Sequence, residues 1–256
     1  MGGRGASSGL MPKPGKMPRL QQKPKQPKQP DLTPGRDLQT ATQATATLAQ
    51  IASMTDDQLA QAVIDSRSVD MPNFLNDVQD QTQKFVYQVG LNGAPQVMDQ
   101  QQFDQFLQQN NIPRSQIMSR SVNKNGPYSA QQIINTFKYS ELTYIGGKQG
   151  GQASGAGTYF DMNGGGATGY GSGATMTAVY NPATARVIDF NALRRQAASF
   201  ASSHPKFAHA VGGFTSGHNG NASIYALAMG YNAISGGPVS HSYQNIIDRS
   251  AVVVLK

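Results

Sequence analysis

The stretch Gly155-Ala156-Gly157-Thr158-Tyr159-Phe160-Asp161 lies in the most glycine-rich part of the chain and decides how the surrounding sequence folds. Residues 146–173 hold twelve of the 28 glycines, so most of this part is expected to form loops. The β-branched and aromatic residues of the stretch instead favour a strand. We therefore expect a strand over residues 157–161, with glycine-rich loops on both sides.

Helix-like and strand-like segments are interspersed before and after this strand. Capping-box patterns, in which a side chain at the helix start pairs with a residue three positions later, begin at Thr55 and Ser129, and an acidic cap lies at Asp99; together they predict three helices. Further helices are expected over residues 191–200 and 221–229, and a loop over 204–220. Other strands are expected over 117–122, 175–180, 185–188, 231–234 and 243–255. The order predicts an α+β domain.

The charge of the chain is concentrated at its beginning. Residues 1–36 hold eight Lys and Arg and one Asp, which accounts for the whole formal charge of +7. They contain few branched apolar residues, so we expect a disordered basic arm. Residues 37–74 are expected to form a helical linker, and residues 75–256 the α+β domain. No stretch has the length and apolarity of a membrane span, so no membrane contact is predicted.

Several common catalytic sites are excluded or disfavoured by composition and spacing. The chain has no Cys, which excludes thiolate metal sites and cysteine nucleophiles, and the histidine spacings match no metal-binding helix pattern. A Gly-x-Gly-x-x-Gly pattern at 164–169 is followed by no suitable helix or acidic residue, which argues against a Rossmann site. Gly147-Lys148 lacks the hydroxyl residue of a P-loop, and no G-x-S-x-G elbow is present.

Five separated segments resemble motifs of one known family. They are Arg120-Ser121, residues 155–160, residues 167–171, residues 226–234 and residues 243–252. In this order they resemble the ADP-ribosyltransferase fold, and in particular its phage-encoded and toxin-like members. The resemblance covers a little over half of the chain and implies a split β-sheet core. Residues 1–9 resemble the N-termini of proteins from bacteriophages and integrated elements of Gram-positive bacteria, and so imply a virion or the host cytoplasm as the location.

The resemblance implies a site for NAD, from which such enzymes transfer ADP-ribose to an acceptor such as a host or phage protein. It assigns Arg120 and the adjacent Ser121 to the site, with Arg120 holding the dinucleotide phosphates, a task that suits a guanidinium. It also implies cofactor contacts for a glycine and three aromatic residues, which here are Gly157, Tyr159, Phe160 and Tyr170. No metal is implied.

The sequence departs from the family at the terminal strand. Such enzymes carry a Glu there, which stabilises positive charge on the ribose, whereas this chain has Tyr243 and Gln244 at the matching positions. Gln244 and Asp248 are the candidates to replace it. Glu141 is the only Glu in the chain and does not match the motif.

Two alternatives to a divergent ADP-ribosyltransferase remain open. The first is a fold relative without catalytic activity, which acts as a virion or interaction protein. Its basic arm would be a tether to virion proteins, or would bind nucleic acid by releasing counterions. The second is a metal-independent nuclease that uses His204, His209 or His241 as general acid and base.

Overall fold

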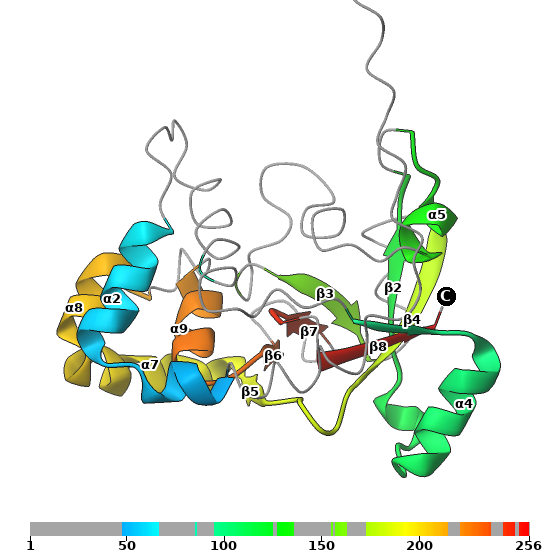
Figure 1. Cartoon of the computed structure of the whole chain (residues 1–256), viewed down its shortest axis with the longest axis horizontal. Helices are drawn as coiled ribbons and strands as arrows, with labels where there is room; N and C mark the ends of the chain where they lie inside the picture. The colour runs from blue at the N-terminus through cyan, green and yellow to red at the C-terminus, as the bar shows by residue number, and fades with distance from the viewer. Residues whose placement is uncertain are drawn as a thin grey trace, which may run out of the picture.

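The computed structural model describes the residues from 48 to 255 in ten ranges. These ranges are 48–66, 85, 95–124, 127–135, 155, 157–162, 173–214, 221–236, 243–248 and 251–255. Within them the chain forms an eight-stranded mixed sheet with helices packed on it (Figure 1). The predicted mixture of helices and strands is therefore confirmed. The basic arm and residues 163–172 lie outside the described residues.

The sheet joins strands from distant parts of the sequence. Its spatial order is β1-β8-β4-β2-β3-β7-β6-β5. The outer pairs β1/β8 and β5/β6 are parallel, and all the other pairs are antiparallel. The strands are β1 (Gln96–Met98), β2 (Met118–Val122), β3 (Thr158–Asp161), β4 (Ala174–Tyr180), β5 (Val187–Asp189), β6 (Ala233–Ser235), β7 (Tyr243–Ile246) and β8 (Val252–Leu255).

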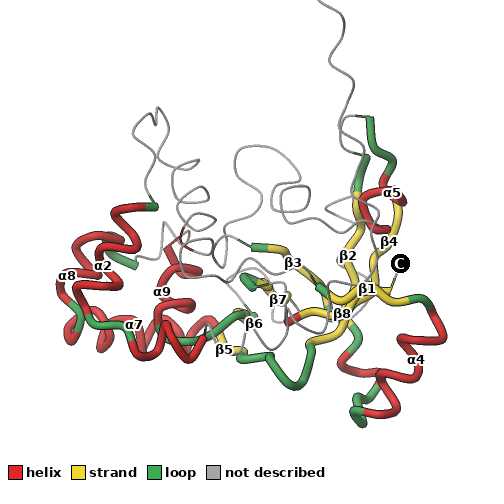
Figure 2. Tube along the Cα trace, viewed as in Figure 1, coloured by secondary structure: helices red, strands yellow, loops and turns green. Residues whose placement is uncertain are grey.

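The helices gather at the two ends of the sheet (Figure 2). At the β5/β6 end lie α2 (Asp56–Asp65), α7 (Phe190–Ser203), α8 (Pro205–Val211) and α9 (Ala222–Ala228). Near the β1/β8 end lies α4 (Gln100–Gln109), followed by the short 3₁₀ helix η1 (Arg114–Gln116). A further helix, α5 (Ala130–Asn135), packs against β2 and β4.

The capping boxes predicted at Thr55 and Ser129 are confirmed, and the predicted acidic cap at Asp99 also forms a full capping box. Thr55 before α2 and Asp99 before α4 each exchange hydrogen bonds with the Gln three residues later. Ser129 makes the same reciprocal pair with Gln132 at the start of α5, with distances of 2.8 and 3.2 Å. Each box satisfies backbone N–H groups that the first helical turn leaves without a partner, so these helix starts are specified locally.

Alternation along the strands gives the sheet two distinct faces. We call the face that carries Ile234 and Val179 face A, and the opposite face, which carries Met118 and Ile246, face B. On face A, Ile234 belongs to a large core with α2, α7, α8 and α9, and Val179 belongs to a small core with α4. On face B, a separate core includes residues of α5. Face A is therefore packed by helices at both of its ends.

Residues 48–66 contribute to the large core. Leu48 and Ile51, which are helical, and Leu59 and Val63 of α2 are fully buried in the same cluster as α7, α8 and α9. The expected linker over 37–74 thus contains a segment that packs against the C-terminal half of the chain.

Two expectations about secondary structure were wrong. Residues 205–211, expected as part of a loop, form α8, with Pro205 in its first turn. The start of α8 is stabilised by Asp56, which is about 150 residues away in sequence, so no local sequence pattern predicts this helix. The expected continuous strand over 243–255 is two strands, β7 and β8, on either side of a turn. In addition, β1 had not been predicted.

No helix in the described part of the chain is long and apolar enough to cross a membrane.

Candidate functional site

The strands β2 and β3 are joined by little backbone pairing, and Arg120 bridges them. Their one register pair is Ser119 with Asp161, whereas β2 and β4 share five pairs and β3 and β7 share four. Next to that pair, Nη1 of Arg120 donates a hydrogen bond of 2.7 Å to the carbonyl oxygen of Tyr159. The guanidinium therefore supplies part of the contact between β2 and β3.

Arg120 lies on an apolar part of the sheet. It alternates with Met118 and Val122 on face B, both of which belong to the core there, and only 6% of its surface is exposed. A buried guanidinium is costly unless it is hydrogen-bonded, and its bond to the Tyr159 carbonyl offsets part of that cost. Because the Tyr159 side chain projects from face A, Arg120 contacts the backbone of Tyr159 and not its ring.

The turn before β3 needs two glycines because it packs closely on other elements. A Cβ at Gly157 would lie 2.0 Å from Oδ1 of Asn245, and a Cβ at Gly155 would lie 2.3 Å from Oγ of Ser223. The carbonyl of Gly155 accepts hydrogen bonds from the Tyr159 hydroxyl, at 2.5 Å, and from Nδ2 of Asn245, at 3.0 Å. The turn is thus fixed to β7 and to the start of α9.

The middle of face A carries polar side chains where its two ends carry apolar ones. Neither helix-covered core on this face includes a residue of β2 or β3. By register, a row of three residues crosses β4, β2 and β3; two residues further along each strand, Ser121 lies on the same face by alternation, as do Tyr159 and its partner Asn245. We call these residues the polar strip: Thr177, Ser119 and Asp161 in the row, and Ser121, Tyr159 and Asn245 beyond it.

Several groups of the polar strip are withdrawn from solvent. Ser121 and Asp161 are 5% and 3% exposed, and Asn245 is fully buried. The buried hydroxyl of Ser119 has no hydrogen-bond partner among the described residues. Buried polar groups are normally hydrogen-bonded, so the polar strip is a polar part of the protein interior between the two apolar cores of face A.

The structure separates the candidate residues from the segment expected as the terminal strand. Gln244 is paired with Phe160, and Tyr243 with Asp161, which places both positions beside β3; their side chains lie outside what the structure describes. Asp248 is fully buried in the turn after β7, where its N–H donates to the carbonyl of Asn232 at 3.1 Å. Asp248 lies four residues beyond Gln244, which is about 13 Å in an extended chain, so it does not belong to the polar strip.

The remaining predicted residues fall into three groups. Ser121 and Tyr159 belong to the polar strip, and Gly157 supports the turn that leads to it. Phe160 is 1% exposed in the core of face B, so it packs as an ordinary core residue. Tyr170 lies outside the described residues. The structure therefore brings together Arg120, Ser121, Gly157, Tyr159 and the backbone of Gln244 at the junction of β2, β3 and β7.

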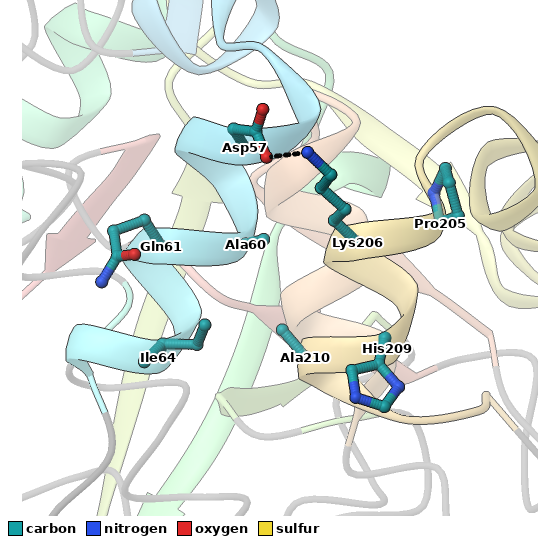
Figure 3. A pocket seen from close by; sticks show the side chains of 8 residues that line it. All are labelled: Asp57, Ala60, Gln61, Ile64, Pro205, Lys206, His209 and Ala210. Atoms are coloured by element: carbon teal, nitrogen blue, oxygen red, sulfur yellow. Dashed lines mark hydrogen bonds and ion pairs between the residues drawn. The ribbon is translucent and has the colours of Figure 1, made fainter.

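The two described histidines do not share a site. His204 stacks on Phe200, with ring centroids 4.0 Å apart, and lines a hollow of about 300 Å³. His209 lines a different hollow of about 540 Å³, between α2 and α8, together with Asp57, Ile64 and Lys206 (Figure 3). His218 and His241 lie outside the described residues. The described part of the chain thus offers no acid and base pair of histidines.

Polar contacts hold α2 against α8 beside the hollow in Figure 3. The carboxylate of Asp56 accepts the N–H groups of Lys206 and Phe207, at 3.0 and 2.8 Å, and Nζ of Lys206 lies 2.5 Å from Oδ1 of Asp57. Desolvation raises the pKa of Asp56, but the two backbone hydrogen bonds outweigh it, so this pKa lies below its ordinary value. The hydrogen bond and charge of Asp57 raise the pKa of Lys206. These contacts explain the hollow as part of the helix packing.

Sequence reasoning missed Ser119, Asp161 and Asn245 as members of the candidate site. A usable signal was present in the alternation of polar residues, because Ser119 and Ser121 stand two apart on one predicted strand, and Tyr159 and Asp161 on the next. The register that places these strands side by side could not be deduced from the sequence.

Comparison with protein-family models, with curated proteins and with solved structures gives no match for this chain.

Proposed function

We propose that this chain is a divergent ADP-ribosyltransferase that binds NAD at the junction of β2, β3 and β7 and transfers ADP-ribose to a protein acceptor. The observation that carries the proposal is the adjacency of three motif segments. Arg120 on β2 and Tyr159 on β3 are 39 residues apart, and β7 lies more than 80 residues further along the chain. These segments, picked from the sequence by their resemblance to one family, lie on neighbouring strands.

The chemistry of the junction is compatible with a dinucleotide. Arg120 projects from face B and holds the Tyr159 carbonyl, so it positions β3 and does not itself reach a ligand on face A. Tyr159 offers an aromatic surface on face A for a nicotinamide ring. Tyr159 lies on β3 between β2 and β7, so its ring belongs to the region where the three motif segments meet.

The reaction is balanced as a substitution at the ribose. The bond between C1′ and the nicotinamide nitrogen breaks, and neutral nicotinamide leaves with the bonding electron pair. An electron pair from the acceptor then forms a new bond to C1′, and the acceptor loses its proton to solvent. Positive charge develops on the ribose during this exchange, so the protein accelerates it by placing polar or negative groups beside the ring.

Release of nicotinamide tests the proposal directly. The full chain is incubated with NAD labelled in the nicotinamide ring or in the adenylate, with and without a bacterial lysate. We expect released nicotinamide and transfer of the adenylate label to protein. Arg120→Ala is expected to lower both, because the guanidinium holds β3, which carries Tyr159, against β2. Absence of both signals with the unaltered chain would falsify the proposed function.

A control variant separates this effect from a general loss of charge. Arg194 is an exposed residue of α7, so Arg194→Ala removes a guanidinium away from the junction. We expect it to leave nicotinamide release unchanged. Since Arg120 also joins β2 to β3, the thermal unfolding of both variants is measured, and the rates are compared at a temperature where each variant is folded.

A second candidate, a fold relative without catalytic activity, is favoured by one specific observation. The positions beside β3 on β7 are occupied by Tyr243 and Gln244, neither of which carries a negative charge. Such a protein would act through a stable complex or in a virion, with the basic arm as a tether. Co-purification with assembled particles, together with NAD binding but no nicotinamide release, would favour this candidate.

A further inference from the structure

We propose that the hollow where β2 ends and α5 begins binds a small organic anion that carries a flat ring, of the class of nucleoside monophosphates. The hollow has a volume of about 940 Å³, and Lys124 and Tyr128 are among the residues that line it. None of its lining residues belongs to the polar strip. The inference therefore goes beyond the proposed function and does not depend on it.

Three segments of the chain form the walls of this hollow, and close packing holds them together. They are the end of β2, the first turn of α5 with the residues before it, and the start of β4 (Figure 1). A Cβ at Gly173 would lie 2.5 Å from the carbonyl oxygen of Val122 and 2.7 Å from Cβ of Ala130. The capping box of Ser129 and Gln132 fixes where α5 begins. The walls are thus parts of the folded core region and not a loose surface.

The charge of the lining favours an anion. Among the described residues that line the hollow, Lys124 is the one charged side chain, and it is exposed. No carboxylate in the described part of the chain forms an ion pair with it. An ammonium group binds phosphate as a point charge through its three N–H donors. A phosphate or carboxylate in the hollow would therefore meet a positive charge and no negative one.

The ring of Tyr128 favours a flat partner. Part of this half-buried side chain packs against the core of face B, and it also lines the hollow. Aromatic side chains stack on planar rings, and on nucleobases of any sequence. Nearby, Nε2 of Gln131 donates a hydrogen bond of 3.0 Å to Asn135, which leaves its second N–H and its carbonyl oxygen for the polar edge of such a ring.

The size of the hollow distinguishes a nucleotide from a simple ion. Sites for small molecules have volumes of roughly 300 to 1,000 Å³, so this hollow lies near the upper end of that range. It is larger than the hollows beside His204 and His209, which have about 300 and 540 Å³. An inorganic phosphate would occupy little of this space. A ligand with both a ring and an anionic group uses Tyr128 and Lys124 together.

The test compares a nucleotide with its two parts on the full chain. We titrate the protein with AMP, with adenosine and with inorganic phosphate at low salt, by isothermal titration calorimetry. Because both groups of AMP bind at one site, we expect it to bind at least about tenfold more tightly than either part. Lys124→Gln should weaken AMP binding about threefold and leave adenosine unchanged, and this difference should disappear near about 0.5 M salt.

Two further substitutions test the ring and the position of the charge. Tyr128→Phe keeps the ring and should keep the affinity for AMP, whereas Tyr128→Leu should weaken AMP and adenosine alike by about fivefold or more. Lys206→Gln is the matched control, because Lys206 lies on α8 and does not line this hollow. It should leave the binding of AMP unchanged.

Three results would overturn the inference. They are no binding of AMP to the unaltered chain, equal affinities for AMP and inorganic phosphate, and equal losses of AMP affinity in Lys124→Gln and Lys206→Gln. Because Tyr128 also packs on the core, the decision rests on Lys124→Gln, whose side chain is exposed, even where Tyr128→Leu does not fold. Absence of nicotinamide release would remove the proposed function and leave this site standing.

Discussion

The carboxylate of Asp56 on α2 accepts the backbone N–H of Phe207 on α8 at 2.8 Å, across 151 residues of sequence. The same carboxylate accepts the N–H of Lys206 at 3.0 Å, so one side chain satisfies two of the donors that the first turn of α8 leaves without a partner. An early segment of the chain thereby completes a helix near its end.

This relationship predicts that Asp56→Asn lowers the melting temperature more than Asp57→Asn. Asn keeps an acceptor oxygen but loses the charge, which interacts favourably with the start of a helix. Asp57 pairs with Lys206 where both side chains are largely exposed, and exposed pairs contribute little. Differential scanning calorimetry at neutral pH measures both variants. Equal melting temperatures would show that the contact with Asp56 does not stabilise α8.

The same contact predicts a loss of stability in acid. The pKa of Asp56 is lowered by folding, so its contribution is present above the ordinary value of 3.8 and disappears as the pH falls through the lower folded value. Urea unfolding between pH 5 and pH 2 should therefore show a smaller decrease in Asp56→Asn than in the unaltered chain. Parallel curves for the two proteins would contradict the assignment.

Alkaline pH should destabilise the protein through two tyrosines. Burial raises the pKa of Tyr180 and of Tyr225, so both favour the folded state below pH 10 and oppose it as the pH rises above that value. The pKa of Lys206 is also raised in the folded protein, so its contribution to stability is likewise lost as the pH rises. Tyr180→Phe is expected to flatten the loss of stability between pH 9 and pH 11, measured by urea unfolding. Parallel curves for Tyr180→Phe and the unaltered chain would contradict this expectation.

Two glycines with positive φ differ in the space around them. Gly157→Ala, at a φ of +158°, would place a methyl group 2.0 Å from Oδ1 of Asn245, whereas at Gly230, at a φ of +82°, the added Cβ meets nothing within 4 Å. We expect Gly230→Ala to cost about 1 kcal/mol of backbone strain. Gly157→Ala should cost more, by about 1 to 3 kcal/mol for forced overpacking. Chemical unfolding gives both values, and the reverse order would show that Asn245 moves away easily.

The sequence was informative where local physical chemistry decides the structure. The capping boxes at Thr55, Asp99 and Ser129 specify helix starts within four residues, and all three helices begin there. It was uninformative where distant segments decide. The helix α8 depends on Asp56, and the row of Thr177, Ser119 and Asp161 depends on the pairing of three strands far apart in sequence. The polar strip could be recognised only after that register was known.

The last prediction concerns Ser119, whose hydroxyl is buried and has no hydrogen-bond partner among the described residues. A buried polar group without a partner costs about 1 to 3 kcal/mol, so Ser119→Ala should leave the free energy of unfolding unchanged or raise it. Urea unfolding measures the effect, with the exposed Ser202→Ala on α7 as the control. A variant that is less stable than the unaltered chain would show that the Ser119 hydroxyl contributes a hydrogen bond to the folded protein.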